Sequence, residues 1–404
     1  MTACSPEILA ARSVVLWESG SRDAACSAAL QAAEQAGDRI DLFGRAGSFC
    51  LQQGHLSAAE HAFETITRLD SGWPVGHHLL GTCRMRQGRP VAAIAPLRQA
   101  ASLEPNTPSI HTALAEALLS AGQLEAGWKQ WTWRFGGRIV PPHPEHPAPV
   151  WDGTALNGRV LMLWLEQGLG DQLQFVRFVR RIQGRVWLQA PRRLHSLFES
   201  LPVERLIDAG ESVSGFDVQL PLLSLPMVLG VGLTNLDSAA YLQAPDQALP
   251  MLEPADGTFR VGLVWGSKPT HPSAPLRDCP LPLLATLSTV PGVSLYGLQF
   301  GDAARALQDH PDITDLSSIL GDFGQTAAIV ERMDLIITVD TAMAHLAGSL
   351  GVPVWTLLGR DPDWRWMCDR ADSPWYRSMR LFRNTEGWPA LVEAVQVALR
   401  ERLQ

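Results

Sequence analysis

The sequence predicts an α + α/β protein in which a helical solenoid precedes two parallel α/β lobes. Two observations carry this prediction. Glycines recur every 34 residues through the first third of the chain, whereas short apolar runs alternate with helical segments from residue 159 onward. A fixed period of this length is typical of stacked helix–turn–helix units. The alternating pattern is typical of parallel sheets covered by helices.

Composition limits the class of protein. With 404 residues, 46% of them hydrophobic and 18% charged, the chain can form two or three packed domains. A net charge of −8 argues against a nucleic-acid-binding surface, which needs clustered basic side chains. The six cysteines form no C-x-x-C pair, so zinc spacing is absent. No signal sequence or run of 18 apolar residues is visible, which predicts a cytoplasmic chain without an integral membrane segment.

Four columns of residues share the 34-residue register. They are Gly20, Gly54, Gly88 and Gly122; Gly47, Gly81 and Ala115; Pro74 and Pro108; and Ala29, Phe63, Leu97 and Trp131. Glycine suits a turn because it tolerates positive φ where a helix ends. Proline suits the first turn of the next helix, where its missing N–H costs little.

This pattern resembles the tetratricopeptide (TPR) repeat, so residues 1–137 are predicted to form a TPR-like helical domain. Such arrays stack into a concave surface that binds proteins or peptides. A protein acceptor or partner is therefore expected on these repeats. A structural spacer or a homo-oligomerisation arm remains the alternative.

Two segments rich in proline separate the repeats from the rest and divide the rest in two. Five prolines in residues 141–153 predict an extended linker. A second break lies at 245–257, and the segments on either side, 159–182 and 259–268, each open with a strand and a glycine turn. They predict two Rossmann-like lobes, residues 138–252 and 253–404. Ligands of such sheets bind beyond the carboxyl ends of the strands, here in the cleft between the lobes.

The first candidate motif is the glycine turn that follows the first strand of the earlier lobe. It comprises Gly168, Gly170, Asp171 and Gln172, with the glycines allowing a sharp turn. Asp171 can act as the N-cap of the helix that follows. It can also act as a general base that removes a proton from an acceptor hydroxyl. The sequence leaves both interpretations open.

Two motifs of the later lobe suit an anion. The first is a turn of small residues with a cation, and its members are Trp265, Gly266, Ser267 and Lys268. The second is a strand that leads into a helix beginning at Asp340, Thr341 and Ala342, with His345 one turn further on. A helix N-terminus offers free N–H groups to a diphosphate. Asp340 and Thr341 can instead be caps only, and His345 can instead fill the core.

Four stretches together resemble the ADP-heptose–lipopolysaccharide heptosyltransferase family, and more closely its TPR-fused bacterial branch. They are LWLEQGLGDQLQF, GLVWGSK, DLIITVDTAMAHLAGSLGVPVW and DPDWRWMCDRADSPWYRSMRLFR, and the resemblance covers about residues 150–400. It implies a GT-B fold and an inverting, metal-independent transferase that uses a nucleotide-diphosphate sugar as co-substrate and no cofactor.

The resemblance also implies roles for single residues. Asp171 matches the catalytic base of the family, and Lys268 matches a lysine that contacts the donor phosphates. The segment from Asp340 to Ala342 matches the D-T-G segment at the diphosphate and donor sugar, and His345 matches the histidine of that helix. Ala342 stands where the family usually has glycine, which narrows the approach of the diphosphate and bears on the identity of the donor.

Other polar and aromatic residues near these motifs are weaker candidates. Gln299 lies at a strand end, near the expected nucleoside. Asp361 and Asp363 spell D-x-D, but a metal site is not expected there because the fold is of the metal-free type. The segment Trp364, Arg365 and Trp366 suits base stacking or phosphate contact, and equally suits core packing.

The motifs together predict a glycosyltransferase that moves a sugar from a nucleotide-sugar donor to a hydroxyl, on a protein recruited by the repeats. Two alternatives stay open. The acceptor can be a glycan or lipopolysaccharide, with the repeats serving assembly only. The chain can also be a catalytically inactive scaffold that binds protein partners.

Overall fold

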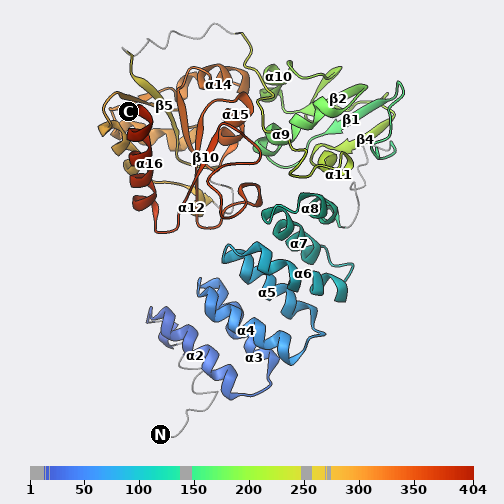
Figure 1. Cartoon of the computed structure of the whole chain (residues 1–404), viewed down its shortest axis with the longest axis vertical. Helices are drawn as coiled ribbons and strands as arrows, with labels where there is room; N and C mark the ends of the chain where they lie inside the picture. The colour runs from blue at the N-terminus through green and yellow to red at the C-terminus, as the bar shows by residue number, and fades with distance from the viewer. Residues whose placement is uncertain are drawn as a thin grey trace. The chain divides into compact units, whose positions relative to one another are not determined.

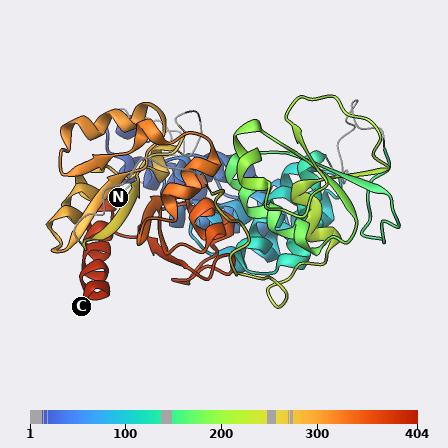
Figure 2. The same ribbon diagram turned by 90° about the horizontal axis from the view of Figure 1, so that it is seen from above.

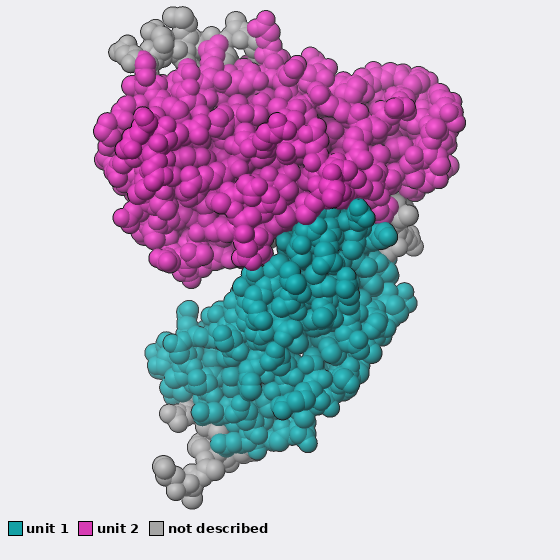
Figure 3. All heavy atoms as spheres, in the orientation of Figure 1, with its two compact units in different colours: residues 1–141 teal, residues 142–404 magenta. Residues whose placement is uncertain are grey.

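The computed structural model describes residues 13, 15–17, 19–136, 148–246, 257–268, 270 and 274–404. It divides into two compact units, residues 1–141 and 142–404 (Figures 1 and 3). The first unit is helical and the second contains two parallel sheets, so the predicted fold class is confirmed. The predicted domain boundaries at 137/138 and 252/253 lie outside the described residues and stay predictions.

Unit 1 consists of consecutive helices joined by tight turns (Figure 1). They are α2 (Arg22–Gln35), α3 (Ile40–Gln52), α4 (Leu56–Leu69), α5 (Pro74–Arg86), α6 (Pro90–Leu103), α7 (Pro108–Ser120) and α8 (Leu124–Trp131), followed by the 3-10 helix η1 (Thr132–Phe135). All four glycines of the first column have φ between 71° and 82°. Pro74 and Pro108 begin α5 and α7. Both columns therefore mark helix boundaries.

The glycine column of Gly47 and Gly81 contacts the column of Phe63 and Leu97, so the same helix–helix contact occurs twice. A methyl group at position 47 would lie 2.6 Å from the Phe63 ring, and one at position 81 would lie 2.4 Å from Cγ of Leu97. The helices of each pair thus approach so closely that glycine is needed opposite a large apolar side chain. Phe63 and Leu97 are fully buried as a result.

The first sheet of unit 2 has four parallel strands in the order β3-β2-β1-β4. They are β1 (Val160–Trp164), β2 (Arg185–Ala190), β3 (Arg205–Asp208) and β4 (Val218–Pro221). All residues of β1 are buried, as expected for a central parallel strand. It leads into α9 (Leu169–Phe175) and the 3-10 helix η2 (Val176–Arg181), and β2 leads into α10 (Arg192–Phe198). Residues 148–246 are called the first lobe below.

The second sheet has six parallel strands in the order β10-β9-β8-β5-β6-β7. They are β5 (Phe259–Val264), β6 (Val293–Gly297), β7 (Ile313–Asp315), β8 (Leu335–Val339), β9 (Val354–Leu358) and β10 (Met379–Arg383). Helices α12 (Ala274–Arg277), α14 (Phe323–Val330) and α15 (Ala342–Leu350) lie between them in the chain. Residues 257–404 are called the second lobe.

One apolar core holds the second lobe together. Strand residues such as Val261, Leu335 and Leu357 pack in it with Val395 and Leu399 of α16 (Trp388–Leu403), the red helix of Figure 2. Because the strands of this sheet pair in parallel, the carboxyl ends of β5, β6, β8 and β9 share one edge. Across the described ranges, no helix has the length and apolar character to cross a membrane.

Candidate active site

The two helices that follow β1 and β8 meet at their N-termini. Gly170 of α9 lies so close to α15 that a methyl group there would be 2.9 Å from Cδ2 of His345 and 3.5 Å from Cα of Ala342. Only glycine allows this approach without displacement of the neighbouring helix. The turn with Asp171 and the helix start at Thr341, which belong to different lobes, are therefore brought together.

One interpretation of the sequence expected Asp171 to be the N-cap of α9, and this is wrong. Gly168 is the N-cap, and Asp171 is the third residue of the helix. Its Oδ2 nevertheless accepts the N–H of Gly168 at 2.8 Å, so the carboxylate caps the helix from within. Its Oδ1 accepts a hydrogen bond from Nη2 of Arg365 in the second lobe. The side chain is 19% exposed, so it is still reachable by a ligand.

Arg365 is the buried cation of this site. Besides Asp171 it binds Oε1 of Gln174 through Nε at 2.7 Å and Oδ1 of Asp363 through Nη1 at 2.8 Å. Only 6% of the residue is exposed. Burial opposes its charge, but Asp363 and Asp171 hold the pKa of Arg365 above its usual range. The sequence left phosphate contact and core packing open for this residue, and the structure makes it a bridge between the lobes.

Asp340 directly follows β8 and is buried beside a second arginine. Its Oδ2 lies 3.5 Å from Nη1 of Arg277, which ends α12. Burial raises the pKa of Asp340 to about 6, against a lowering influence of Arg277. Within the described part of the chain, Oδ2 of Asp340 and Nε of Arg277 have no hydrogen-bond partner. This pair therefore retains hydrogen-bonding capacity for a ligand.

Thr341 is the N-cap of α15, and its hydroxyl accepts the N–H of Met343 at 3.3 Å. Ala342 is the first residue of the helix. His345 is buried, stacks on Trp366 with ring centroids 5.2 Å apart, and shares a hydrogen bond of 2.8 Å with the hydroxyl of Tyr376. Burial lowers the pKa of His345 to about 3, so its ring is neutral near pH 7. It packs against the meeting point of the helices rather than facing solvent.

The turn after β5 differs from the predicted anion-binding loop. Oε1 of Gln299 accepts the N–H groups of Trp265 and Gly266 at 3.1 and 2.9 Å, and Oδ1 of Asp278 accepts the N–H of Ser267 at 2.7 Å. These three amides are thus used by the protein itself. Gln299 and Ser267 hold the loop in shape, because the hydroxyl of Ser267 also donates to Asp278 at 2.7 Å.

Lys268, which follows this loop, is exposed. No ion pair involving it occurs within the described residues. Lys268 and Arg277 can therefore meet an anion at this edge, together with the N-terminus of α15. Sequence reasoning missed Arg277, because a lone arginine in the segment APLRDCP matches no motif.

Two glutamines of α9 complete the site. Gln172 and Gln174 are 2% and 0% exposed. In the part of the chain that the structure describes, Oε1 of Gln172 and Nε2 of Gln174 lack hydrogen-bond partners. Gln172 was expected from the acceptor-side turn, whereas Gln174 was missed because its role depends on Arg365.

Arg177 of η2 is a further buried arginine that the sequence did not reveal as a bridge. It donates to the carbonyl oxygen of Trp375 at 2.6 Å and to the hydroxyl of Tyr241 at 3.1 Å. Its guanidinium lies 4.6 Å from the ring centroid of Tyr376. Both arginines thus join the same two lobes. Arg177 reaches from the first lobe to the second, and Arg365 reaches from the second lobe to the first.

The D-x-D segment has a structural role at its second aspartate. Asp363 accepts hydrogen bonds from the backbone N–H and Nη1 of Arg365, at 3.0 and 2.8 Å. Arginine lowers the pKa of Asp363 against the opposing effect of burial. A search of the described ranges finds no cluster of three or more His, Cys, Asp or Glu side chains suited to a metal.

Known proteins resemble this chain in sequence. Residues 303–396 match the family model described as Glycosyltransferase family 9 (heptosyltransferase). Protein FlbA of Caulobacter vibrioides is 26% identical over 411 residues, a match that covers 89% of this chain and 67% of FlbA. The family match spans β7 to β10 with α15, and it includes the segment of Asp340 and Thr341.

Solved structures with a similar arrangement score low. A mutant O-GlcNAc transferase of Thermobaculum terrenum covers 100% of this chain with 93% of its own length, at 16% identity and a TM-score of 0.30. MamA from AMB-1 covers 32% of this chain with 70% of its own length, at 17% identity and a TM-score of 0.28. Scores of this size support no inference about the site.

Proposed function

We propose that the glycosyltransferase domain of this chain, which is of heptosyltransferase type and follows TPR-like repeats, moves a sugar from a nucleoside diphosphate donor to a hydroxyl acceptor. The observation that carries the proposal is the contact of α9 with α15 through Gly170. It joins a partly exposed carboxylate, Asp171, to a helix N-terminus that suits a diphosphate.

The second lobe would bind the donor. The N-terminus of α15 offers N–H groups and a partial positive charge to the phosphates, and Arg277 and Lys268 add full charges. Oδ2 of Asp340 can accept a hydrogen bond from a sugar hydroxyl, which would satisfy its unused capacity. With these cations in place, we propose that no metal or other cofactor is needed to stabilise the leaving group.

The first lobe would supply the base. Asp171 takes the proton of the acceptor hydroxyl while the oxygen of that hydroxyl forms a bond to the anomeric carbon, and the bond from that carbon to the diphosphate oxygen breaks. The leaving nucleoside diphosphate keeps the electron pair and is stabilised at α15. A single displacement of this kind inverts the configuration at the anomeric carbon.

For the acceptor we propose a protein held by the TPR-like unit. Its repeats recur with the packing of a solenoid, an architecture that presents extended protein-binding surfaces. A glycan or lipopolysaccharide acceptor is the second candidate, and the heptosyltransferase family match favours it. The cytoplasmic location expected from the sequence stays a prediction.

Isothermal titration of the full chain with ADP-heptose, UDP-N-acetylglucosamine and GDP-mannose tests the donor proposal. We expect at least one of them to bind in the presence of EDTA and to release its nucleoside diphosphate slowly. Binding of none would favour the inactive scaffold. Binding that needs a divalent cation would contradict the metal-free proposal.

The acceptor is tested with a labelled form of the donor that binds, in a lysate of cells lacking this chain. We expect the full chain to transfer label to material that protease degrades. Label found only in a protease-resistant glycan or lipid fraction would support the second candidate instead.

A further inference from the structure

The guanidinium of Arg365 uses all three of its nitrogens on fixed acceptors. Two acceptors, Asp171 and Gln174, lie on α9 of the first lobe, and the third, Asp363, lies beside Arg365 in the second. A planar guanidinium can satisfy such a set in only one orientation. Arg365 therefore places a positive charge beside Asp171 and also fixes the orientation of the Asp171 carboxylate.

Arg365 is itself held firmly in that orientation. The indole N–H of Trp375 donates to its carbonyl oxygen at 2.8 Å, and its guanidinium lies 4.2 Å from the ring centroid of Trp364. On the far side of the carboxylate, the N–H of Gly168 holds Oδ2 of Asp171. One oxygen of Asp171 is thus positioned by its own helix and the other by the opposite lobe.

We propose that Arg365 is a positioning residue, which orients Asp171 as a base only while the two lobes are joined. The proposal rests on the proposed function of Asp171. A direct role in donor binding is the competing interpretation, and it is disfavoured because the nitrogens of Arg365 are already bonded to protein acceptors. The coupling would make proton removal depend on the contact between the donor-side and acceptor-side lobes.

Hydrogen exchange of the full chain without ligand tests the positioning directly. In Arg365→Gln we expect the amides at the start of α9, Gly168 included, to exchange about tenfold faster, as loss of a charge-assisted bond predicts. Arg365→Lys should show a smaller change. Arg370→Gln is the matched control from the same segment, because Arg370 pairs with the exposed Asp372. Unchanged exchange in Arg365→Gln would overturn the proposal.

Release of nucleoside diphosphate from the donor that binds supplies the second readout. We expect Arg365→Gln to lower kcat about 10- to 100-fold, the range seen when a group supporting a catalytic residue is lost. The KM for the donor should stay within about twofold, since Arg365 makes no contact with the donor in this proposal and its loss leaves donor binding unchanged. Arg365→Lys should recover part of kcat.

A double variant separates the two interpretations. In an Asp171→Asn background, Arg365→Gln should cause no further loss, because a positioning residue acts through the group it positions. A raised donor KM with kcat retained would identify Arg365 as a donor ligand and overturn the proposal. If the wild-type chain turns over none of the donors, the proposed function fails, whereas hydrogen exchange still decides whether Arg365 orients Asp171.

Discussion

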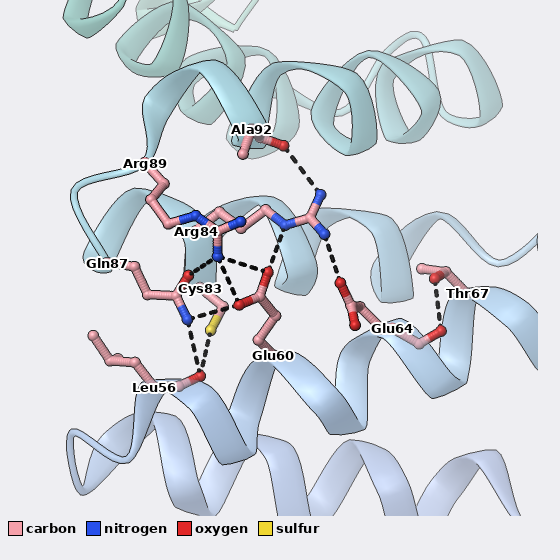
Figure 4. Close-up of polar contacts among 9 residues, drawn as sticks. All are labelled: Leu56, Glu60, Glu64, Thr67, Cys83, Arg84, Gln87, Arg89 and Ala92. Atoms are coloured by element: carbon pink, nitrogen blue, oxygen red, sulfur yellow. Dashed lines mark hydrogen bonds and ion pairs between the residues drawn. The ribbon is translucent and has the colours of Figure 1, made fainter.

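Two charge networks, one in each unit, are built from the same residue types but are connected in different ways. In unit 1, Glu60 of α4 accepts hydrogen bonds from Arg84, Gln87 and Arg89, which follow it by 24 to 29 residues (Figure 4). In unit 2, Asp171 pairs with Arg365, 194 residues away. The first network joins neighbouring helices of one repeat array, whereas the second joins two lobes.

The networks also differ in how completely their polar atoms are paired. Both oxygens of Glu60 are bonded, and Arg84 also donates to Glu64 and to the carbonyl of Ala92. Among the candidate site residues of unit 2, buried polar atoms of Gln172, Gln174, Arg277 and Asp340 lack hydrogen-bond partners within the described part of the chain. A group that exists for stability is expected to be fully paired, and unpaired buried atoms gather where a ligand completes them. The comparison supports a stabilising role for the first network and, under the proposed function, ligand binding by the second.

Asp171→Asn gives the largest expected effect. The amide cannot take a proton, so kcat for nucleoside diphosphate release should fall about 100- to 10,000-fold. Donor affinity measured by titration should be retained, because the proposed donor-binding groups lie on the second lobe. Turnover equal to that of the wild type would remove Asp171 from the chemistry and leave the network of unit 2 as structural as that of unit 1.

Asp340→Asn should stabilise the chain at neutral pH. The pKa of Asp340 is raised to about 6 by burial, so the folded state resists ionisation that the unfolded chain undergoes near pH 4. The wild type therefore loses stability, on the order of 2–3 kcal/mol, as the pH rises from 4 through 6. Thermal melting from pH 3.5 to 8 should show the variant and wild type alike at the acid end and separated above about pH 6. A variant that melts below the wild type at pH 7 would show that Asp340 serves stability.

The repeat contact offers a test confined to unit 1. A methyl group in Gly81→Ala would press on Leu97, and we expect a net loss of about 1–2 kcal/mol after the gain in helix propensity. Gly44→Ala is the matched control, because its nearest neighbours would be 4.0 Å away and the same change should stabilise by about 0.5–1 kcal/mol. Urea unfolding measures both. Equal effects of the two variants would mean that close helix packing is not the reason for glycine at position 81.

The sequence predicts contacts that repeat along the chain better than contacts that occur once. The contact of Gly81 with Leu97 repeats that of Gly47 with Phe63, 34 residues earlier, so its columns were visible without coordinates. The pair of Asp171 with Arg365 occurs once and spans most of unit 2, so no period or spacing reveals it. The motif of Gly170 and Asp171 was visible because strand ends and glycine turns have local signatures, whereas the use of Gln299 on the amides of residues 265 and 266 depends on how two strands align.

Glu60 itself falls outside the repeat pattern. Its counterparts 34 residues before and after are Cys26 and Ile94, so the network of Figure 4 occurs in one repeat only. The columns of the sequence therefore predict the helix packing of unit 1 but not its charge network.

Glu60→Gln should lower stability by about 1 kcal/mol near pH 7, because Arg84 and Arg89 lose a charged acceptor that is only partly exposed. Arginine and glutamine partners lower the pKa of Glu60 despite its burial, so its contribution is present above about pH 4.5 and is lost at lower pH. This dependence is opposite in sign to that of Asp340. Asp41→Asn is the control, since its pair with Arg39 is exposed and should contribute little. If melting curves of the Glu60 variant followed the same pH trend as those of the Asp340 variant, the division between a stabilising and a ligand-directed network would not hold.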